Sequence, residues 1–257
     1  MSDRKTAVRI ANHFAYLQFL WDDPAIISIF EPLGITPRGQ GDMALRLSPV
    51  GEIPLEVAAS RLGSFPRALV EKLLGRVDAS AADVLASGIE GLTKAAEEAW
   101  GDNPATEELA DLLEVAVAGA ELDQRILASA WATVPWSGAP ARLFGAATVL
   151  REHRGDGHWM AARVAGLTPA EMHVMNRLSK GGTLENIGHG FRPEQAERIA
   201  ERLADRGLVS GTEVTDRGLS LREAIETKTD ELDAPPWDRL GSDGIARVIE
   251  LGSPFLD

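Results

Sequence analysis

The stretch "RPEQAERIAERLADRGLVSGTEVTDRGLSLREAI", residues 192–225, contains three local patterns in succession. Its first half spaces Ala196, Ile199, Ala200 and Leu203 along one face of a helix. The segment "LVSGTEVT" places a Ser210-Gly211 turn between two short runs that favour strands. The remaining "DRGLSLREAI" returns to a helical pattern. These residues therefore predict a helix, a small two-stranded wing and a second helix.

The residues before this stretch extend the pattern. "TPAEMHVMNRLSK" begins with Thr168, a proline and Glu171, which is the arrangement of a capping box at the start of a helix. "TLENIGHG" follows as a short helix. The resulting order of helix, short helix, helix, wing and helix is that of a winged helix-turn-helix.

Most of the rest of the chain is also predicted to be helical, whereas residues 35–54, rich in Gly and Pro, are expected to form a loop or a short hairpin. Apolar residues at Ile10, Phe14, Leu17 and Trp21 predict a first helix over residues 3–21. The predicted helices that follow lie at residues 24–33, 54–62, 64–75, 80–100, 104–119 and 121–132, and another starts near residue 139.

We therefore expect an all-α fold with a small β-wing, divided into two regions. Residues 1–136 form a helical region with a helix-turn-helix-like pair at 54–75, and residues 137–257 form a linker helix and the winged helix. The pair at 54–75 resembles the later "TLENIGHGFRPEQAERIAERLADR" in its Leu-Glu start and its internal proline. Two degenerate winged-helix halves are thus an open alternative.

Composition excludes several classes of protein. The 257 residues include no cysteine, which excludes disulfides, thiol nucleophiles and metal sites built on cysteine. No apolar run approaches the roughly 20 residues that cross a bilayer, and the N-terminus lacks the apolar stretch of a signal peptide. We expect a cytoplasmic protein that does not enter a membrane.

Charge bears on nucleic-acid binding, because Lys and Arg must replace the counterions of DNA phosphates. The whole chain has a net charge of −13, and residues 168–233 contain 9 basic and 13 acidic residues. Glu194 and Glu197 lie at the start of the expected recognition helix, and the wing contains no Lys or Arg. Arg192, Gln195 and Arg198 are the candidates to face DNA. We expect DNA binding to be weak.

The segment "LREHRGDGHWMAARVAGL", residues 150–167, gathers charged residues around two glycines and allows two interpretations. In the first it is a corner: a helix ends at Arg154, Gly155 is its left-handed C-cap, and Asp156 caps a helix that begins at His158. In the second it is a site at a kink. Its candidate residues, for ligand binding or catalysis, are Arg151, His153, Arg154, Asp156 and His158.

The chemistry of the second interpretation follows from these residue types. A histidine can act as a general acid or base near neutral pH, a carboxylate can fix its tautomer, and an arginine can hold an anionic oxygen. His153, Asp156 and His158 also resemble a two-histidine, one-carboxylate metal set. The chain offers no convincing outer ligand for a metal, so we expect neither a metal nor another cofactor.

Two resemblances accompany these patterns. Residues 167–225 resemble the winged-helix domain of MarR-type regulators, through "ADRGLV" at the end of the recognition helix and "VTDRG" after the wing. "ARLFGAATVLREHRGDGH", joined to that domain and closed by "APPW", resembles an actinobacterial family of helix-turn-helix proteins with a near-identical "LREHRGDGH". MarR-type proteins usually keep a basic residue in the wing, which this chain lacks. The resemblance implies the fold more than an activity.

The expected function is that of a regulator-like winged-helix protein that binds a small organic ligand. The alternative is an enzyme of specialised metabolism that uses His153, Asp156 and His158 for acid–base chemistry, and a third is a pure interaction module. MarR-type proteins pair through terminal helices, and an apolar C-terminal tail leads us to expect a homodimer. That tail contains Trp237, Leu240, Ile245, Val248, Ile249, Leu251, Phe255 and Leu256.

Overall fold

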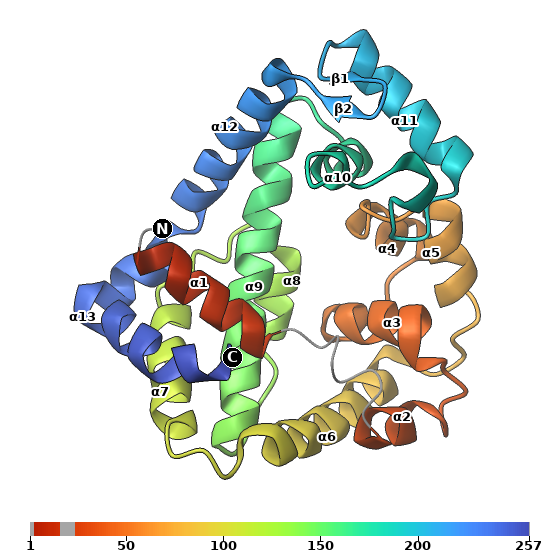
Figure 1. The fold of residues 1–257 in the computed structure, drawn as a ribbon. Coiled ribbons are helices and arrows are strands. Elements are labelled where there is room, and N and C mark those ends of the chain that lie inside the picture. Colours follow the sequence, from red (N-terminus) through yellow and green to blue (C-terminus); the bar gives the residue numbers. More distant parts are fainter. Residues whose placement is uncertain (1–2, 16–23, 257) are drawn as a thin grey trace. The chain divides into compact units, whose positions relative to one another are not determined.

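The computed structural model describes residues 3–15 and 24–256 (Figure 1). Within these residues the chain is helical apart from one two-stranded antiparallel sheet, which confirms the all-α fold with a small β-wing. The predicted first helix is present as α1 (Asp3–Phe14), whereas Leu17 and Trp21 lie outside the described residues. None of the described helices combines the length and the apolar character that crossing a membrane requires.

The chain forms two compact units, each assembled from segments that are distant in sequence. Unit 1 consists of residues 1–52, 77–156 and 232–257, and unit 2 consists of residues 53–76 and 157–231. This division differs from the expected boundary after residue 136. The reason is that the predicted pair at 54–75 packs with the winged helix and not with its neighbours in sequence.

Unit 1 is a helical assembly around an apolar core. Large side chains such as Phe14, Trp131 and Phe144 are almost fully buried in it. Its helices are α1, α2 (Pro24–Phe30), α3 (Asp42–Leu47), α6 (Ala81–Trp100), α7 (Thr106–Val117), α8 (Ile126–Trp131), the first part of α9 (Ala139–Val164) and α13 (Ala234–Gly252). An irregular turn, η2 (Pro37–Gly41), and two short helical turns, η3 (Ser48–Val50) and η5 (Ser253–Phe255), complete it.

The apolar C-terminal tail packs against other helices of unit 1. Helix α13 packs on α1 and α7, and Trp237 and Val248 are buried. Gly252 leaves no room for a side chain, because a Cβ there would lie 2.3 Å from Ile10. The Phe255 ring packs edge-on against Phe14, with 5.0 Å between the ring centroids. Of the eight apolar residues that led us to expect a homodimer, two are therefore buried inside the chain and the other six are partly exposed.

Unit 2 contains the winged helix, in which the predicted helix cap and the predicted strand pairing are both present. Thr168 caps α10 through the capping box with Glu171, and Val209 pairs with Val214 across the wing. Its helices are α4 (Leu55–Arg61), α5 (Arg67–Leu74), the end of α9, α10 (Pro169–Leu178), α11 (Pro193–Asp205) and α12 (Asp216–Leu232). The short turn η4 (Leu184–Asn186) precedes α11, and the wing is β1 (Val209–Ser210) with β2 (Glu213–Val214).

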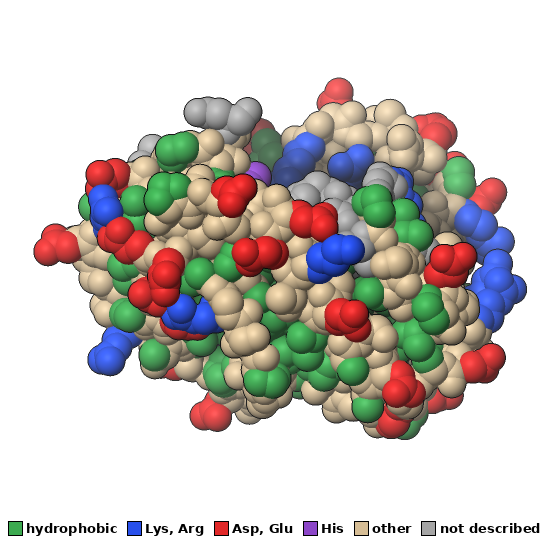
Figure 2. All heavy atoms as spheres, turned by 90° about the horizontal axis from the view of Figure 1, so that it is seen from below, with side chains coloured by type: hydrophobic (Ala, Val, Ile, Leu, Met, Phe, Trp, Pro, Cys, Tyr) green, Lys and Arg blue, Asp and Glu red, His purple; other side chains and the backbone are tan. Residues whose placement is uncertain are grey.

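The two units differ sharply in charge. Unit 1 has 12 basic and 25 acidic residues, so it carries the whole net charge of −13. Unit 2 has 14 of each and is neutral. Acidic side chains are spread over the face drawn in Figure 2, interspersed with basic ones. The net acidity of the chain therefore arises in unit 1. Within unit 2, the excess of two basic residues in 53–76 offsets the excess of two acidic residues in 157–231.

Candidate functional site

The "LREHRGDGH" segment lies inside one continuous helix, α9, which runs from Ala139 to Val164. The expected corner and kink at Gly155 are therefore wrong: Gly155 is helical and does not have a positive φ. Two helical glycines cost roughly 1 kcal/mol each relative to alanine. Burial of apolar side chains of α9, including Leu143, Phe144 and Leu150, offsets this cost.

Helix geometry separates the candidate residues. An α-helix turns by about 100° per residue, so His153 and Asp156 lie on neighbouring positions, whereas His158 points about 140° away from His153. His153 and Asp156 belong to unit 1, and His158 belongs to unit 2. The structure thus brings His153 and Asp156 close together on the helix and leaves His158 apart.

His153 is completely buried, with an exposed fraction of 0%. Its Nδ1 lies 3.1 Å from Oδ1 of Asp233, while its Nε2 has no hydrogen-bond partner among the described residues. A carboxylate only accepts hydrogen bonds, so Nδ1 carries a proton. In the neutral ring Nε2 is then an acceptor that lacks a donor.

Asp233 lies at the turn between α12 and α13, and its carboxylate accepts hydrogen bonds from more than one side chain. Its Oδ2 accepts a hydrogen bond from Nε1 of Trp237 at 3.3 Å and lies 3.7 Å from Nη1 of Arg154. Its exposed fraction is 3%. Asp233 therefore orients the His153 ring and receives Arg154 as a counter-charge.

Arg125 fixes the same region through the backbone. It is buried and donates hydrogen bonds to the carbonyls of His153 and Leu232. Burial lowers the pKa of Arg125, against the opposing effect of Asp233 and Asp156. We refer to His153, Asp233, Arg125, Arg154 and Trp237 as the His153 cluster.

Asp156 and Glu152 take structural positions beside this cluster. Asp156 is buried and accepts a long hydrogen bond, 3.5 Å, from the backbone N–H of Ala128 in the first turn of α8. Because α9 is continuous, Asp156 does not cap a helix that begins at His158. Glu152 is 1% exposed and receives two hydrogen bonds from Arg46, at 3.0 and 2.8 Å, and one from Arg151 at 2.9 Å. Burial acts to lower the pKa of Arg46, but Glu152 raises it above its ordinary value.

His158 has a separate environment in unit 2. Its Nδ1 lies 3.2 Å from Oγ1 of Thr229 and 4.0 Å from Oε1 of Glu226. Thr229 donates its own proton to the carbonyl of Ile225, so its oxygen accepts from His158. Among residues 3–15 and 24–256, His, Asp and Glu side chains form no group of three that could hold a metal ion.

The expected DNA-facing residues lie at the start of α11. The side chain of Gln195 accepts a hydrogen bond from the backbone N–H of Arg192 at 3.0 Å, so it acts as a cap. Arg192 and Arg198 are exposed. Farther along α11, Arg202 forms an ion pair with Glu171 at 3.4 Å and also donates to the carbonyl of Arg198.

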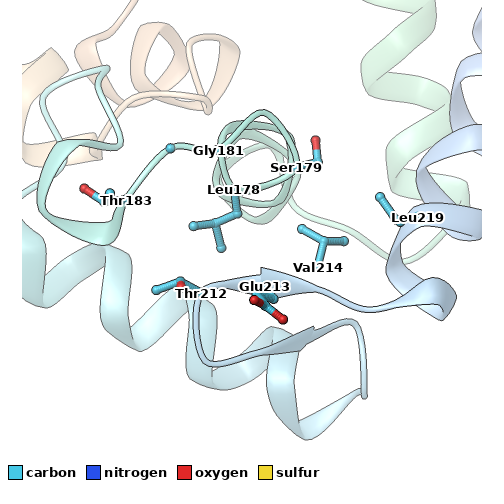
Figure 3. A pocket seen from close by; sticks show the side chains of 9 residues that line it. Leu178, Ser179, Gly181, Thr183, Thr212, Glu213, Val214 and Leu219 are labelled. Carbon is cyan, nitrogen blue, oxygen red and sulfur yellow. The ribbon is translucent and has the colours of Figure 1, made fainter.

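A shallow hollow of about 490 Å³ lies between the end of α10 and the wing (Figure 3). Leu178, Val214 and Leu219 supply its apolar surface, and Thr183, Thr212 and Glu213 lie at its edges. No histidine or arginine lines it. It offers contact surface but no acid–base chemistry comparable to the His153 cluster.

The sequence interpretation missed the partners that give His153 its environment. Arg125 and Asp233 lie 28 and 80 residues away from His153 in the chain. One signal was present: Asp233 directly precedes "APPW", the segment that closes the family resemblance. An acidic residue next to a proline-rich start of a buried helix is a candidate partner for a buried base.

A helix-turn-helix family model matches residues 12–257, which is nearly the whole chain. No curated protein and no solved structure shows a significant match. The matched region includes unit 1 from residue 12 onwards, with the His153 cluster, as well as the winged helix of unit 2. The chain therefore belongs to this helix-turn-helix family.

Proposed function

We propose that this chain is a regulator-like helix-turn-helix protein whose unit 1 binds a small organic ligand at the His153 cluster. The observation that carries the proposal is the buried Nε2 of His153, which has no partner among the described residues. A buried polar atom without a hydrogen bond costs about 1–3 kcal/mol, so such an atom requires an explanation, and a hydrogen-bonding group supplied by a ligand is the one that we propose.

The ligand class follows from the orientation of the ring. Because Asp233 accepts from Nδ1, the neutral ring presents an acceptor at Nε2. The complementary group is a hydrogen-bond donor, and a hydroxyl or phenol on an otherwise apolar molecule satisfies it. Val149 and Leu150, about one turn before His153 on α9, are apolar and buried. We therefore expect a hydroxyl-bearing organic ligand.

A small set of alcohols and phenols, each paired with its methyl ether, tests this proposal by thermal melts. A ligand at about 100 times its Kd stabilises the folded state by about 2.7 kcal/mol. The ether cannot donate, so we expect stabilisation by the hydroxyl compound alone. His153→Asn should abolish this stabilisation, because Asn can still donate to Asp233 but lacks Nε2.

The matched control is His158→Asn, which alters a histidine of unit 2 and should leave the stabilisation unchanged. Stabilisation that persists in His153→Asn, or that is equal for an alcohol and its ether, would contradict the proposal.

The enzyme alternative rests on one specific observation, the pairing of His153 with Asp233. In such a pair the carboxylate orients the ring and Nε2 takes a proton from the substrate hydroxyl. His158 lies on another face of α9, so this chemistry would fall to His153 and Asp233. Product formation from a hydroxyl compound that stabilises the protein, lost in His153→Asn, would favour the enzyme over the regulator.

We expect α11 to contribute little to duplex DNA binding. Its exposed surface includes Glu194, Glu197, Glu201 and Asp205. Arg202 is already paired with Glu171, and Gln195 is used as a cap. Carboxylates beside phosphates are unfavourable, so this face does not supply the charge that non-specific binding requires.

A further inference from the structure

The net positive charge of unit 2 lies in the segment that contains the helix pair α4–α5. Residues 53–76 contain 4 basic and 2 acidic residues, whereas residues 157–231 contain 10 basic and 12 acidic ones. Of the two segments of unit 2, only residues 53–76, which contain this helix pair, have an excess of positive charge.

The pair α4–α5 is fixed to the turn that precedes α11. A Cβ at Gly190 would lie 2.2 Å from Cδ2 of Leu69 in α5, so α5 approaches this turn closely. The Phe65 ring stacks on His189 with a centroid distance of 4.4 Å and an angle of 9°. Nδ1 of His189 lies 3.2 Å from the carbonyl of Ser64.

The backbone of this turn is specialised for the contact. Gly188, His189 and Gly190 have φ values of 82°, 53° and 71°, three left-handed residues in succession. The His189 ring also stacks on His173 of α10, with 3.9 Å between centroids. Such a conformation persists only where the surroundings hold it. Helix α5 and the turn before α11 are thus one rigid structure.

Two cations of this structure are available to a partner. Lys72, near the end of α5, and Arg76, two residues beyond α5, are exposed and have no ion-pair partner among the described residues. Arg67, in contrast, pairs with Glu71 one turn later at 2.7 Å. The α5 end of unit 2 therefore presents positive charge where α11 presents mainly carboxylates.

We propose that α5, rather than α11, carries the contact of unit 2 with the phosphate backbone of duplex DNA. The proposal rests on membership of the helix-turn-helix family, on the excess charge of α4–α5 and on its fixed position at the helix-turn-helix turn. Lys72 and Arg76 replace counterions on phosphates, which gives binding that is weak, independent of sequence and sensitive to salt. This inference is independent of the ligand proposed for unit 1.

Fluorescence anisotropy of the full chain tests it, with a labelled duplex of arbitrary sequence about two helical turns long. Measurements run between about 50 and 200 mM salt, where phosphate contacts change the affinity strongly. For Lys72→Gln/Arg76→Gln we expect a loss of affinity of about tenfold at low salt. The slope of log K against log salt should fall by about 2, since each lost contact contributes about 0.9.

The matched control is Arg192→Gln/Arg198→Gln, which removes two exposed cations at the start of α11 and should change the affinity by less than about threefold. All four side chains are exposed, so both double variants should melt like the unaltered chain. A larger loss in the α11 variant, an equal loss in both, or no binding by the unaltered chain at low salt would overturn the proposal.

Discussion

Units 1 and 2 each bury a histidine, but in opposite surroundings. His153 of unit 1 is paired with the carboxylate of Asp233, and its second nitrogen has no partner among the described residues. His173 of unit 2 has Nε2 3.0 Å from the carbonyl of Ile187 and lies between the rings of His189 and Phe191. The first environment leaves one nitrogen for chemistry. In the second environment, the His173 ring packs between two other rings of the helix-turn-helix.

The comparison also separates two kinds of buried polar group. In unit 1, Asp233 connects side chains from α9 and α13, so several groups depend on one carboxylate. In unit 2, the two central rings of the stack, His173 and His189, each have two ring neighbours and can lose one while keeping the other. We therefore expect single substitutions to have larger effects in the His153 cluster than in the stack.

Asp233→Ala should cause the largest loss of stability. It leaves Nδ1 of His153 and Nε1 of Trp237 without an acceptor and removes the counter-charge near Arg154. Breaking a buried charged network by removing one partner costs about 3–5 kcal/mol. Urea unfolding monitored by far-ultraviolet circular dichroism measures this free energy.

Asp238→Ala is the control for this substitution. Asp238 pairs with Arg4, but its side chain is 64% exposed, and exposed ion pairs contribute about 1 kcal/mol or less. A loss for Asp233→Ala as small as that for Asp238→Ala would show that the cluster does not depend on Asp233.

The sequence predicted the local structure of unit 2 well because the signals there are local. The capping box at Thr168, the wing around Gly211 and the apolar face of α11 each involve residues only a few positions apart. The same holds for the start of α9 at Ala139. Short-range patterns of this kind are read directly from spacing.

The His153 cluster could not be predicted in the same way. Gly155 and Gly157 favour a break in isolation, and burial of α9 on both sides of them, at Leu150 and at Ala162, stabilises the continuous helix. That burial is a tertiary effect, which often overrides local propensity. The pairing of His153 with Asp233 also depends on how α13 folds back, so the sequence identified one side of the contact and missed the other.

The second prediction concerns His173. Burial and the neighbouring His189 lower the pKa of His173 from 6.5 to about 4. Between these two values the unfolded chain binds a proton that the folded chain does not. The contribution of His173 to the free energy of unfolding is therefore fully present above about pH 6.5 and is lost as the pH falls towards 4. The expected loss is roughly 2 to 3 kcal/mol. Urea unfolding at about pH 7.5 and about pH 4.5 measures it.

His173→Phe isolates this contribution, because it keeps a ring in the stack but cannot bind a proton. Other groups titrate over the same range, so the relevant quantity is the difference in pH dependence between the two proteins. The variant should lose less stability on acidification than the unaltered chain. An identical pH dependence would contradict the assignment to His173.

The smallest expected effect, and the only gain, belongs to Gly155→Ala in α9. Gly155 is helical, and a Cβ there would meet nothing within 4 Å, so alanine fits without a clash. Alanine also restricts the unfolded chain, and we expect thermal melts to show stabilisation of up to about 1 kcal/mol. Gly211→Ala in the wing turn is the control: its Cβ also has open space, but its φ of 60° should make alanine destabilising by about 1 kcal/mol. A loss of stability for Gly155→Ala comparable to that for Gly211→Ala would restore the corner in place of the continuous helix.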